Sequence, residues 1–116
     1  MVQFYDPRID ASFAALSDPT RRGVLAALSR NLASISDLAD RFDMTLTGIK
    51  KHVSILEDAG FVATEKVGRV RICRLSERSL EKEAAFIDWY QQIWSARFDG
   101  LESVAQELEH RESKNE

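Results

Sequence analysis

Apolar residues recur every three or four positions through the first sixty residues, a period that predicts amphipathic helices. The expected helices cover residues 7–16, 19–28, 34–42 and 45–59. Asp18 before Pro19, and Ser34 three residues before Asp37, are helix-start signals, because a short polar side chain caps the free N–H groups of a first turn. Gly60 is expected to end the fourth helix in a left-handed conformation. Two residues separate the third and fourth helices, which therefore form a helix-turn-helix pattern.

After Gly60 the apolar period changes to two, which is the period of a β-strand. The predicted strands cover residues 61–67 and 69–75. They meet at Gly68, which supplies the positive φ of a tight hairpin. In the second strand Arg69 and Arg71 alternate with valine and isoleucine, so one face is expected to be basic and the other to rest on the helices.

Ser76 is expected to cap a final helix over residues 77–111. Its apolar positions fall seven residues apart at Leu80, Ile87, Trp94, Leu101 and Leu108. Further apolar residues on the same side are Ala84, Tyr90, Phe98, Val104 and Ala105. A stripe of this length exceeds what a core of about sixty residues covers, which indicates a second subunit. Gly100 lies within the stripe, and the sequence leaves open whether it kinks the helix.

Length and composition fit one globular domain over residues 1–116, because 116 residues with 44% hydrophobic and 30% charged side chains suffice for a core. No apolar run approaches the roughly 18 residues of a membrane span. The first residues lack the basic and apolar regions of a signal peptide. Cys73 is the single cysteine, which excludes an internal disulfide and a cysteine-rich zinc site. The expected location is the reducing cytoplasm.

The formal net charge of −3 argues at first against a nucleic-acid partner. Its distribution along the chain changes that interpretation. Residues 19–75 carry ten Lys and Arg against six Asp and Glu, a net charge of +4, whereas residues 1–18 and 76–116 carry −2 and −5. A basic central segment between acidic ends is compatible with DNA binding.

Two motifs carry a resemblance to a known family. Residues 16–22, LSDPTRR, resemble the L-x-D-P-T-R-x opening of ArsR-type bacterial transcription regulators. Residues 51–62, KHVSILEDAGFV, are similar to the family's K-H-L-x-x-L-x-x-A-G-L-V segment at the end of the recognition helix. Together with the hairpin, the match spans about residues 12–75. It implies a mainly α, winged helix-turn-helix fold in the order α-α-α-α-β-β-α.

The resemblance implies a homodimeric, sequence-specific repressor that binds double-stranded DNA at a palindromic operator. The DNA-binding core would be residues 19–75 with its wing at 61–75, and the first and last helices, 6–17 and 77–111, would form the dimer. The implied dimer-interface residues are Phe13, Leu80, Ile87, Tyr90, Trp94, Phe98, Leu101 and Leu108. Recognition helices of the two subunits would then reach successive major grooves about 34 Å apart.

Several polar residues of the core are candidates for contact with DNA. They are Thr45, Thr47, Gly48, Lys50, Lys51, His52 and Ser54 in the recognition helix, Lys66, Arg69 and Arg71 in the wing, and Arg21, Arg22 and Arg41 elsewhere. We expect Thr47, Lys50 and Lys51 to meet base edges, with Lys50 suited to guanine. The wing cations are expected to lie along the phosphate backbone or to reach into the minor groove, and the alternative is an ordinary solvated charged surface.

Four of these residues have structural alternatives. Gly48 permits either close approach to DNA or tight packing against the preceding helix. His52 contacts either a phosphate, when it is protonated, or the backbone or wing of the protein itself. Arg21 and Arg22 contact either phosphates or a carboxylate that braces the core.

Metal sensing is not expected, because the family's known ligand positions are not filled. The helix before the recognition helix lacks cysteine, and the last helix carries only His110, with Tyr90 where the family's motif has histidine. No cofactor is expected, and the chain looks more like the family's non-metal branch. Trp89, Tyr90 and Trp94 either line a pocket for an unknown small-molecule inducer or belong to the core or dimer interface.

Catalysis is not expected, since no Ser/His/Asp order, glycine-rich phosphate loop or carboxylate pair is present. Buried packing is the favoured role of Cys73. The alternative to a DNA-binding repressor is a winged-helix module whose basic hairpin binds an acidic protein.

Overall fold

The computed structural model describes residues 6–78 and 80–115 of the chain. Its elements are α1 (Pro7–Leu16), α2 (Pro19–Leu28), β1 (Ala33–Ser34), α3 (Ile35–Arg41), α4 (Leu46–Asp58), β2 (Val62–Val67), β3 (Val70–Leu75) and α5 (Glu81–Asn115). The described residues form two compact units, one ending at Leu80 and the other containing α5. The single domain stays a prediction.

The predicted caps of α2, α3 and α4 are confirmed. The Asp18 carboxylate accepts a hydrogen bond from the Arg21 N–H, and the Thr45 hydroxyl accepts one from Gly48. Ser34 and Asp37 form the predicted capping box. These local bonds satisfy N–H groups that the first turn leaves without helical partners.

α3 and α4 end in the same way. The N–H groups of Met44 and Phe61 reach back to the carbonyls of Ala39 and Leu56, each at 2.9 Å, which is the Schellman arrangement. Gly60 has the predicted positive φ of 86°. In the turn between α3 and α4 the equivalent residue is Asp43 at φ 52°, and the turn so formed sets the direction in which α4 leaves.

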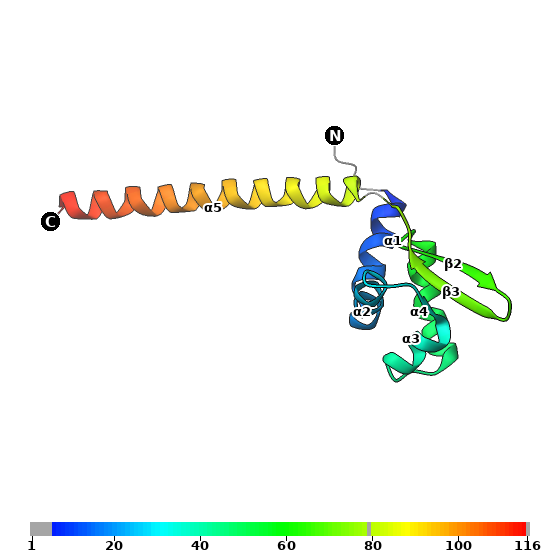
Figure 1. Ribbon diagram of the computed structural model, residues 1–116. Helices are drawn as coiled ribbons and strands as arrows, with labels where there is room; N and C mark the ends of the chain where they lie inside the picture. Colours follow the sequence, from blue (N-terminus) through cyan, green and yellow to red (C-terminus); the bar gives the residue numbers. More distant parts are fainter. Residues whose placement is uncertain (1–5, 79, 116) are drawn as a thin grey trace. The chain divides into compact units, whose positions relative to one another are not determined.

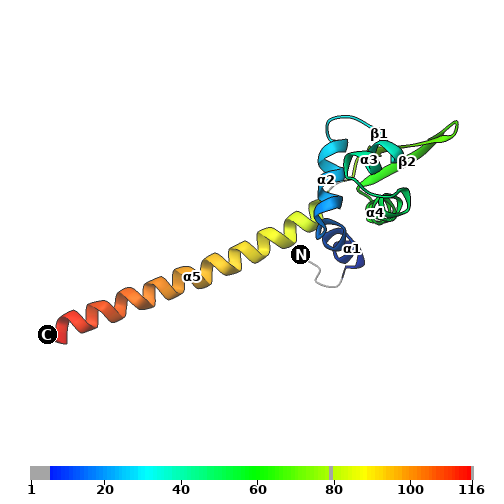
Figure 2. The same cartoon turned by 90° about the horizontal axis from the view of Figure 1, so that it is seen from below.

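The core of the larger unit lies where α2, α3, α4 and the sheet meet (Figures 1 and 2). Val24, Leu38, Ile49 and Leu56 are almost fully buried there. The Phe42 ring packs against Gly23 of α2, where an added Cβ would lie 2.7 Å from the ring. Because the third and fourth helices share this core, their mutual orientation is fixed by packing.

The sheet has three strands in the order β1-β3-β2, all antiparallel. The sequence predicted only the hairpin, so the order α-α-α-α-β-β-α omitted β1. β1 pairs Ala33 with Cys73 and Ser34 with Ile72. β1 was not predicted because a strand of two residues is too short to show an alternation of polar and apolar positions. β2 and β3 turn at Gly68, whose φ of 65° confirms the predicted hairpin conformation.

The expected faces of β3 are reversed. Its buried side carries Cys73, which is fully enclosed, whereas Val70 is 47% exposed and Ile72 is half-buried. Arg71 shares the face of Cys73 because residues two apart lie on the same side of a strand. Arg71 is nevertheless exposed, and the turn end of the β2–β3 hairpin extends beyond the helices (Figures 1 and 2). The alternation of polar and apolar residues in β3 predicted two different faces, but it did not identify which face packs against the helices.

The predicted cap at Ser76 is wrong, as is the helix start at residue 77. The Ser76 hydroxyl donates to the carbonyl of Gly60 and its N–H donates to Phe61, so Ser76 ties the end of β3 to the end of α4. α5 begins at Glu81 and continues through Gly100 without a break (Figure 1). None of the described helices is long and apolar enough to cross a membrane.

Candidate nucleic-acid interface

The sides of α4 have three different surroundings: the core, the exposed surface and the neighbouring elements on its flanks. Ile49, Val53 and Leu56 face the core and are buried. At about 100° per residue, Thr47, Lys51 and Ser54 project from the opposite side, and all three are exposed. These three polar side chains therefore form the outward face of the helix, and they lie among the predicted DNA contacts.

One flank of α4 faces the wing, which is the hairpin β2–β3. Lys50 and Leu46 line a groove of about 370 Å³ together with Lys66, Arg69 and Arg71. Four of the predicted DNA-contacting cations thus come together around one hollow. Ser34 and Ser36 from the start of α3 also line it. Their part in this groove was missed because the sequence presented Ser34 only as a helix cap.

A hydrogen-bonded chain ties the wing to α4 beside this groove. The Thr64 hydroxyl donates to the Glu57 carboxylate at 2.6 Å and accepts from the Arg71 guanidinium at 2.9 Å. Glu57 lies on the wing flank of α4, two turns after Lys50. The wing therefore has a fixed side-chain connection to the recognition helix in addition to the chain between them.

The other flank of α4 faces α2 through His52. Its Nδ1 lies 3.1 Å from Nη1 of Arg21 and 3.7 Å from the Asp18 carboxylate. A guanidinium can only donate, so Nδ1 is the acceptor and the ring proton belongs on Nε2. His52 is 20% exposed. These contacts are structural, as one alternative for His52 stated, but the partners are side chains at the start of α2, whereas the sequence pointed to the backbone or the wing.

Arg21 also fastens α1 to this cluster. Its Nε donates to the Ala15 carbonyl at 2.8 Å and its Nη2 to the Ala14 carbonyl at 3.0 Å. One guanidinium thus joins the C-terminal end of α1, the start of α2 and the flank of α4. The hydrogen bond from the Arg21 backbone N–H is the largest of the effects that hold the pKa of Asp18 below its ordinary value.

Arg22 and Gly48 also have neighbours within the protein. Arg22 donates to the Leu16 carbonyl at 2.7 Å, so both arginines bind backbone carbonyls where a carboxylate was the expected structural partner. An added Cβ at Gly48 would lie 3.2 Å from Met44 and from the Thr45 hydroxyl. The tight contact at Gly48 is therefore with the turn and its own cap residue, whereas the structural alternative named the preceding helix, and close approach to DNA stays a prediction. Burial raises the pKa of the Cys73 thiol, in keeping with packing as its role.

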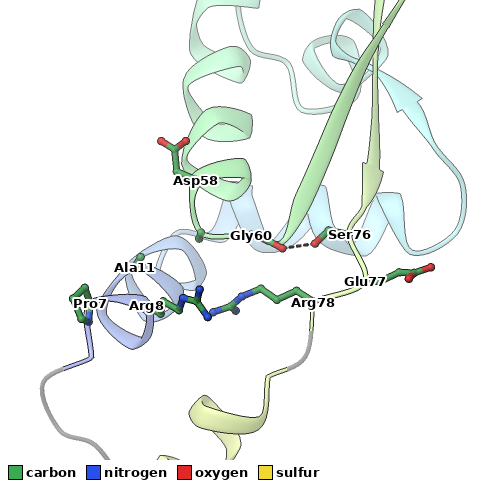
Figure 3. Close-up of a pocket in the computed structure, with 9 residues that line it drawn as sticks. Pro7, Arg8, Ala11, Asp58, Gly60, Ser76, Glu77 and Arg78 are labelled. Carbon is green, nitrogen blue, oxygen red and sulfur yellow. Dashed lines mark hydrogen bonds between the residues drawn. The ribbon is translucent and has the colours of Figure 1, made fainter.

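A second cavity lies away from the wing. It has a volume of about 650 Å³ and is formed by the start of α1, the end of α4 and the segment after β3 (Figure 3). The Arg78 side chain extends across it toward α1, donates to the Ser12 hydroxyl at 2.9 Å and lies over the Phe61 ring. Sequence reasoning missed Arg78. None of the three aromatic residues considered for an inducer pocket lines this cavity.

The predicted dimer residues of α5 are exposed. Its apolar stripe comprises Ile87, Tyr90, Trp94, Phe98, Leu101, Val104 and Leu108, each at least 48% exposed. Leu80 precedes α5, so it lies outside the helix on which the stripe was predicted. Phe13 is half-buried in α1. The Trp94 and Phe98 rings stack at 5.0 Å between centroids, which gives the stripe a flat aromatic centre.

Comparisons with known proteins agree on the helix-turn-helix. Residues 16–65 match a family described as a helix-turn-helix domain. The chain is 39% identical over 79 residues to YuzN, an uncharacterised HTH-type transcriptional regulator of Bacillus subtilis, covering 62% of this chain and 86% of YuzN. The transcriptional repressor SdpR of the same organism is 33% identical over 57 residues, covering 49% of this chain and 63% of SdpR.

Solved structures give the family. An ArsR family transcriptional regulator, RHA00566, is 42% identical with a TM-score of 0.72 over 82% of this chain and 97% of its own. The chain belongs to the ArsR family. An ArsR-like regulator from Rhodococcus sp. RHA1 is 33% identical with a TM-score of 0.71, over 86% of this chain and 92% of its own.

Membership of the ArsR family confirms the predicted resemblance and the winged helix-turn-helix fold. It makes the chain a DNA-binding transcriptional regulator and agrees with the prediction that it is not an enzyme, because the relatives it matches are regulators. Within the part of the chain that the structure describes, no three His, Cys, Asp or Glu residues are grouped to hold a metal ion. The assignment to a non-metal branch stays a prediction.

Proposed function

We propose that this ArsR-family chain is a homodimeric repressor that inserts α4 into the major groove of a palindromic operator. The observation that carries the proposal is the exposed outward face of α4, with Thr47, Lys51 and Ser54 free to approach base edges. Lys66 and Arg69 on the wing supply cations beside that face for the DNA backbone.

Repression as the outcome is supported by the relative SdpR, which is named a transcriptional repressor. A dimer is supported by the exposed stripe of α5. A hollow of about 490 Å³ on that helix is lined by Trp94, Phe98, Leu101 and Val104 among others, and it offers a place for apolar side chains of a second copy. A homodimer is also named for a structural neighbour from Mycobacterium bovis, which shares the fold at 17% identity.

DNA binding is tested by titrating the protein onto the DNA upstream of its own gene at several salt concentrations. A repressor of this kind should prefer one duplex over unrelated sequence and lose affinity steeply with salt. Absence of binding to any duplex at low salt would overturn the proposal. Binding to an acidic protein in place of DNA would support the interaction-module alternative.

The dimer is tested by Leu101→Asp, with Ser103→Asp as the matched control. Leu101 is 69% exposed within the stripe, whereas Ser103 projects from the opposite side of the same helix. Introducing a carboxylate at Leu101 twice per dimer should weaken association by at least about 100-fold, judged from the burial energy of leucine. Sedimentation should show a monomer for Leu101→Asp and a dimer for Ser103→Asp. Equal behaviour of the two variants would mean that the subunits meet elsewhere.

A further inference from the structure

We propose that the groove between α4 and the wing binds one phosphate of the DNA backbone. Lys50 is then a phosphate ligand, whereas the sequence placed it at a guanine edge. The proposal rests on the proposed function, because the ligand is the DNA that this regulator binds. It assigns a different task to each of two adjacent lysines, Lys50 and Lys51.

The position of Lys50 on α4 separates it from the outward face. Lys50 lies one turn after Leu46 and two turns before Glu57, and Glu57 is joined to the wing through Thr64. Lys51 lies about 100° farther round the helix, among the outward residues. Lys50, on the wing flank, therefore lines the groove, whereas Lys51, on the outward face, projects away from the helix.

The groove is lined by positive charges, which favour the binding of an anion. Lys66 and Arg71 are directly opposite each other on neighbouring strands, an arrangement in which like charges destabilise a sheet. Lys50 and Arg69 line the same hollow, and no carboxylate is among its described lining residues. Glu65 pairs with Ile72 on the other face of the hairpin, and the Glu57 carboxylate accepts the Thr64 hydroxyl. A phosphate offsets the repulsion of these four cations.

The remaining lining suits a nucleotide backbone. Ser36 contributes an exposed hydroxyl, a group that commonly donates to phosphate oxygens. Leu46 and Val70, each about half exposed, border the cations with apolar surface. A deoxyribose next to a phosphate presents carbon atoms of this kind. The groove therefore matches a sugar-phosphate unit better than the flat polar edge of a base.

The experiment compares Lys50→Ala with Lys51→Ala on one set of duplexes. The probe is the labelled duplex that the full-length protein selects from random-sequence DNA, together with its single base-pair substitutions. Lys50→Ala should weaken binding to every duplex by the same factor and reduce the slope of log affinity against log salt by about 1.8, which is about 0.9 for the one phosphate bound by each of the two subunits. Lys50→Arg should restore the slope. Both lysines are exposed, so the thermal midpoint should stay unchanged in all variants.

Lys51→Ala, by contrast, should change the preference at one base pair, by roughly 5- to 150-fold. The groove proposal is overturned if Lys50→Ala leaves the salt slope unchanged, or if it relaxes the preference at a single base pair. If the wild-type protein binds no duplex at low salt, the proposed function fails and the groove proposal fails with it. If the wild-type protein binds its duplex and the Lys50→Ala variant shows an unchanged salt slope, only the groove proposal fails and the proposed function stands.

Discussion

Replacing Arg21 by alanine should destabilise the fold without removing a DNA contact. The guanidinium donates to the carbonyls of Ala14 and Ala15 and to His52, at 2.8 to 3.1 Å. A net hydrogen bond contributes about 0.5–1.5 kcal/mol, and the bond to Ala14 is exposed, so the three together amount to about 2 kcal/mol. That is a large share of a typical free energy of unfolding of about 5–15 kcal/mol.

The assay is urea unfolding followed by far-ultraviolet circular dichroism at one protein concentration, because stability of a dimer depends on concentration. Arg21→Lys should recover about half of the loss, since an ammonium cannot reach the three acceptors in the planar geometry of a guanidinium. Arg22→Ala is the control, because it removes a single exposed bond to Leu16 and should cost about 0.5 kcal/mol or less.

DNA binding separates this bracing role from the alternative of phosphate contact. The salt slope of Arg21→Ala should equal that of the wild-type protein at a temperature where both are folded. A slope reduced by about 1.8, one phosphate for each of the two subunits, with a free energy of unfolding unchanged within about 0.5 kcal/mol, would refute the reasoning and make Arg21 a phosphate ligand.

Three further outcomes are expected. Gly23→Ala should lower the free energy of unfolding by about 1–3 kcal/mol in urea titrations, because the new Cβ would meet the Phe42 ring at 2.7 Å; an unchanged stability would show that the ring moves freely. Asp18→Asn tests the lowered pKa of Asp18. The advantage of the wild-type protein should be complete above a pH of about 4, the unfolded pKa, and should disappear as pH falls through the lower folded pKa; an advantage that does not change with pH would contradict it. Gly100→Ala should stabilise α5 by up to about 1 kcal/mol, seen as a higher thermal midpoint, since nothing lies within 4 Å of the added Cβ; a lower midpoint would mean that a partner packs closely there.

Features set by neighbours in sequence could be predicted from the sequence. The caps at Asp18, Ser34 and Thr45 bond to N–H groups three residues away, so their residue types and spacing were sufficient. Ser76 has the same side chain in a similar context, yet it bonds to Gly60, sixteen residues earlier. A serine before an acidic residue does not reveal such a distant acceptor.

The same limit applies to the candidate interface. The outward residues of α4 followed from periodicity, because the core residues of the helix define the opposite side. The partners of Arg21 could not be predicted from the sequence. His52 is 31 residues away, and every residue has a backbone carbonyl, so residue type does not show which carbonyl is an acceptor. The grouping of Lys50 with the wing cations depends on the pairing register of β2 and β3, which alternation alone does not specify.

The short strand β1 makes one residue serve two elements. Ser34 pairs with Ile72 of the wing and its side chain caps α3 through the N–H of Asp37. Opening the wing at this point and fraying the first turn of α3 are therefore one event with a shared free energy. Amide hydrogens at the start of α3 should exchange together with those of β3, and anything that immobilises the wing should slow the exchange of both. The helix-turn-helix and its wing thus behave as one cooperative unit, through a pairing that is only two residues long.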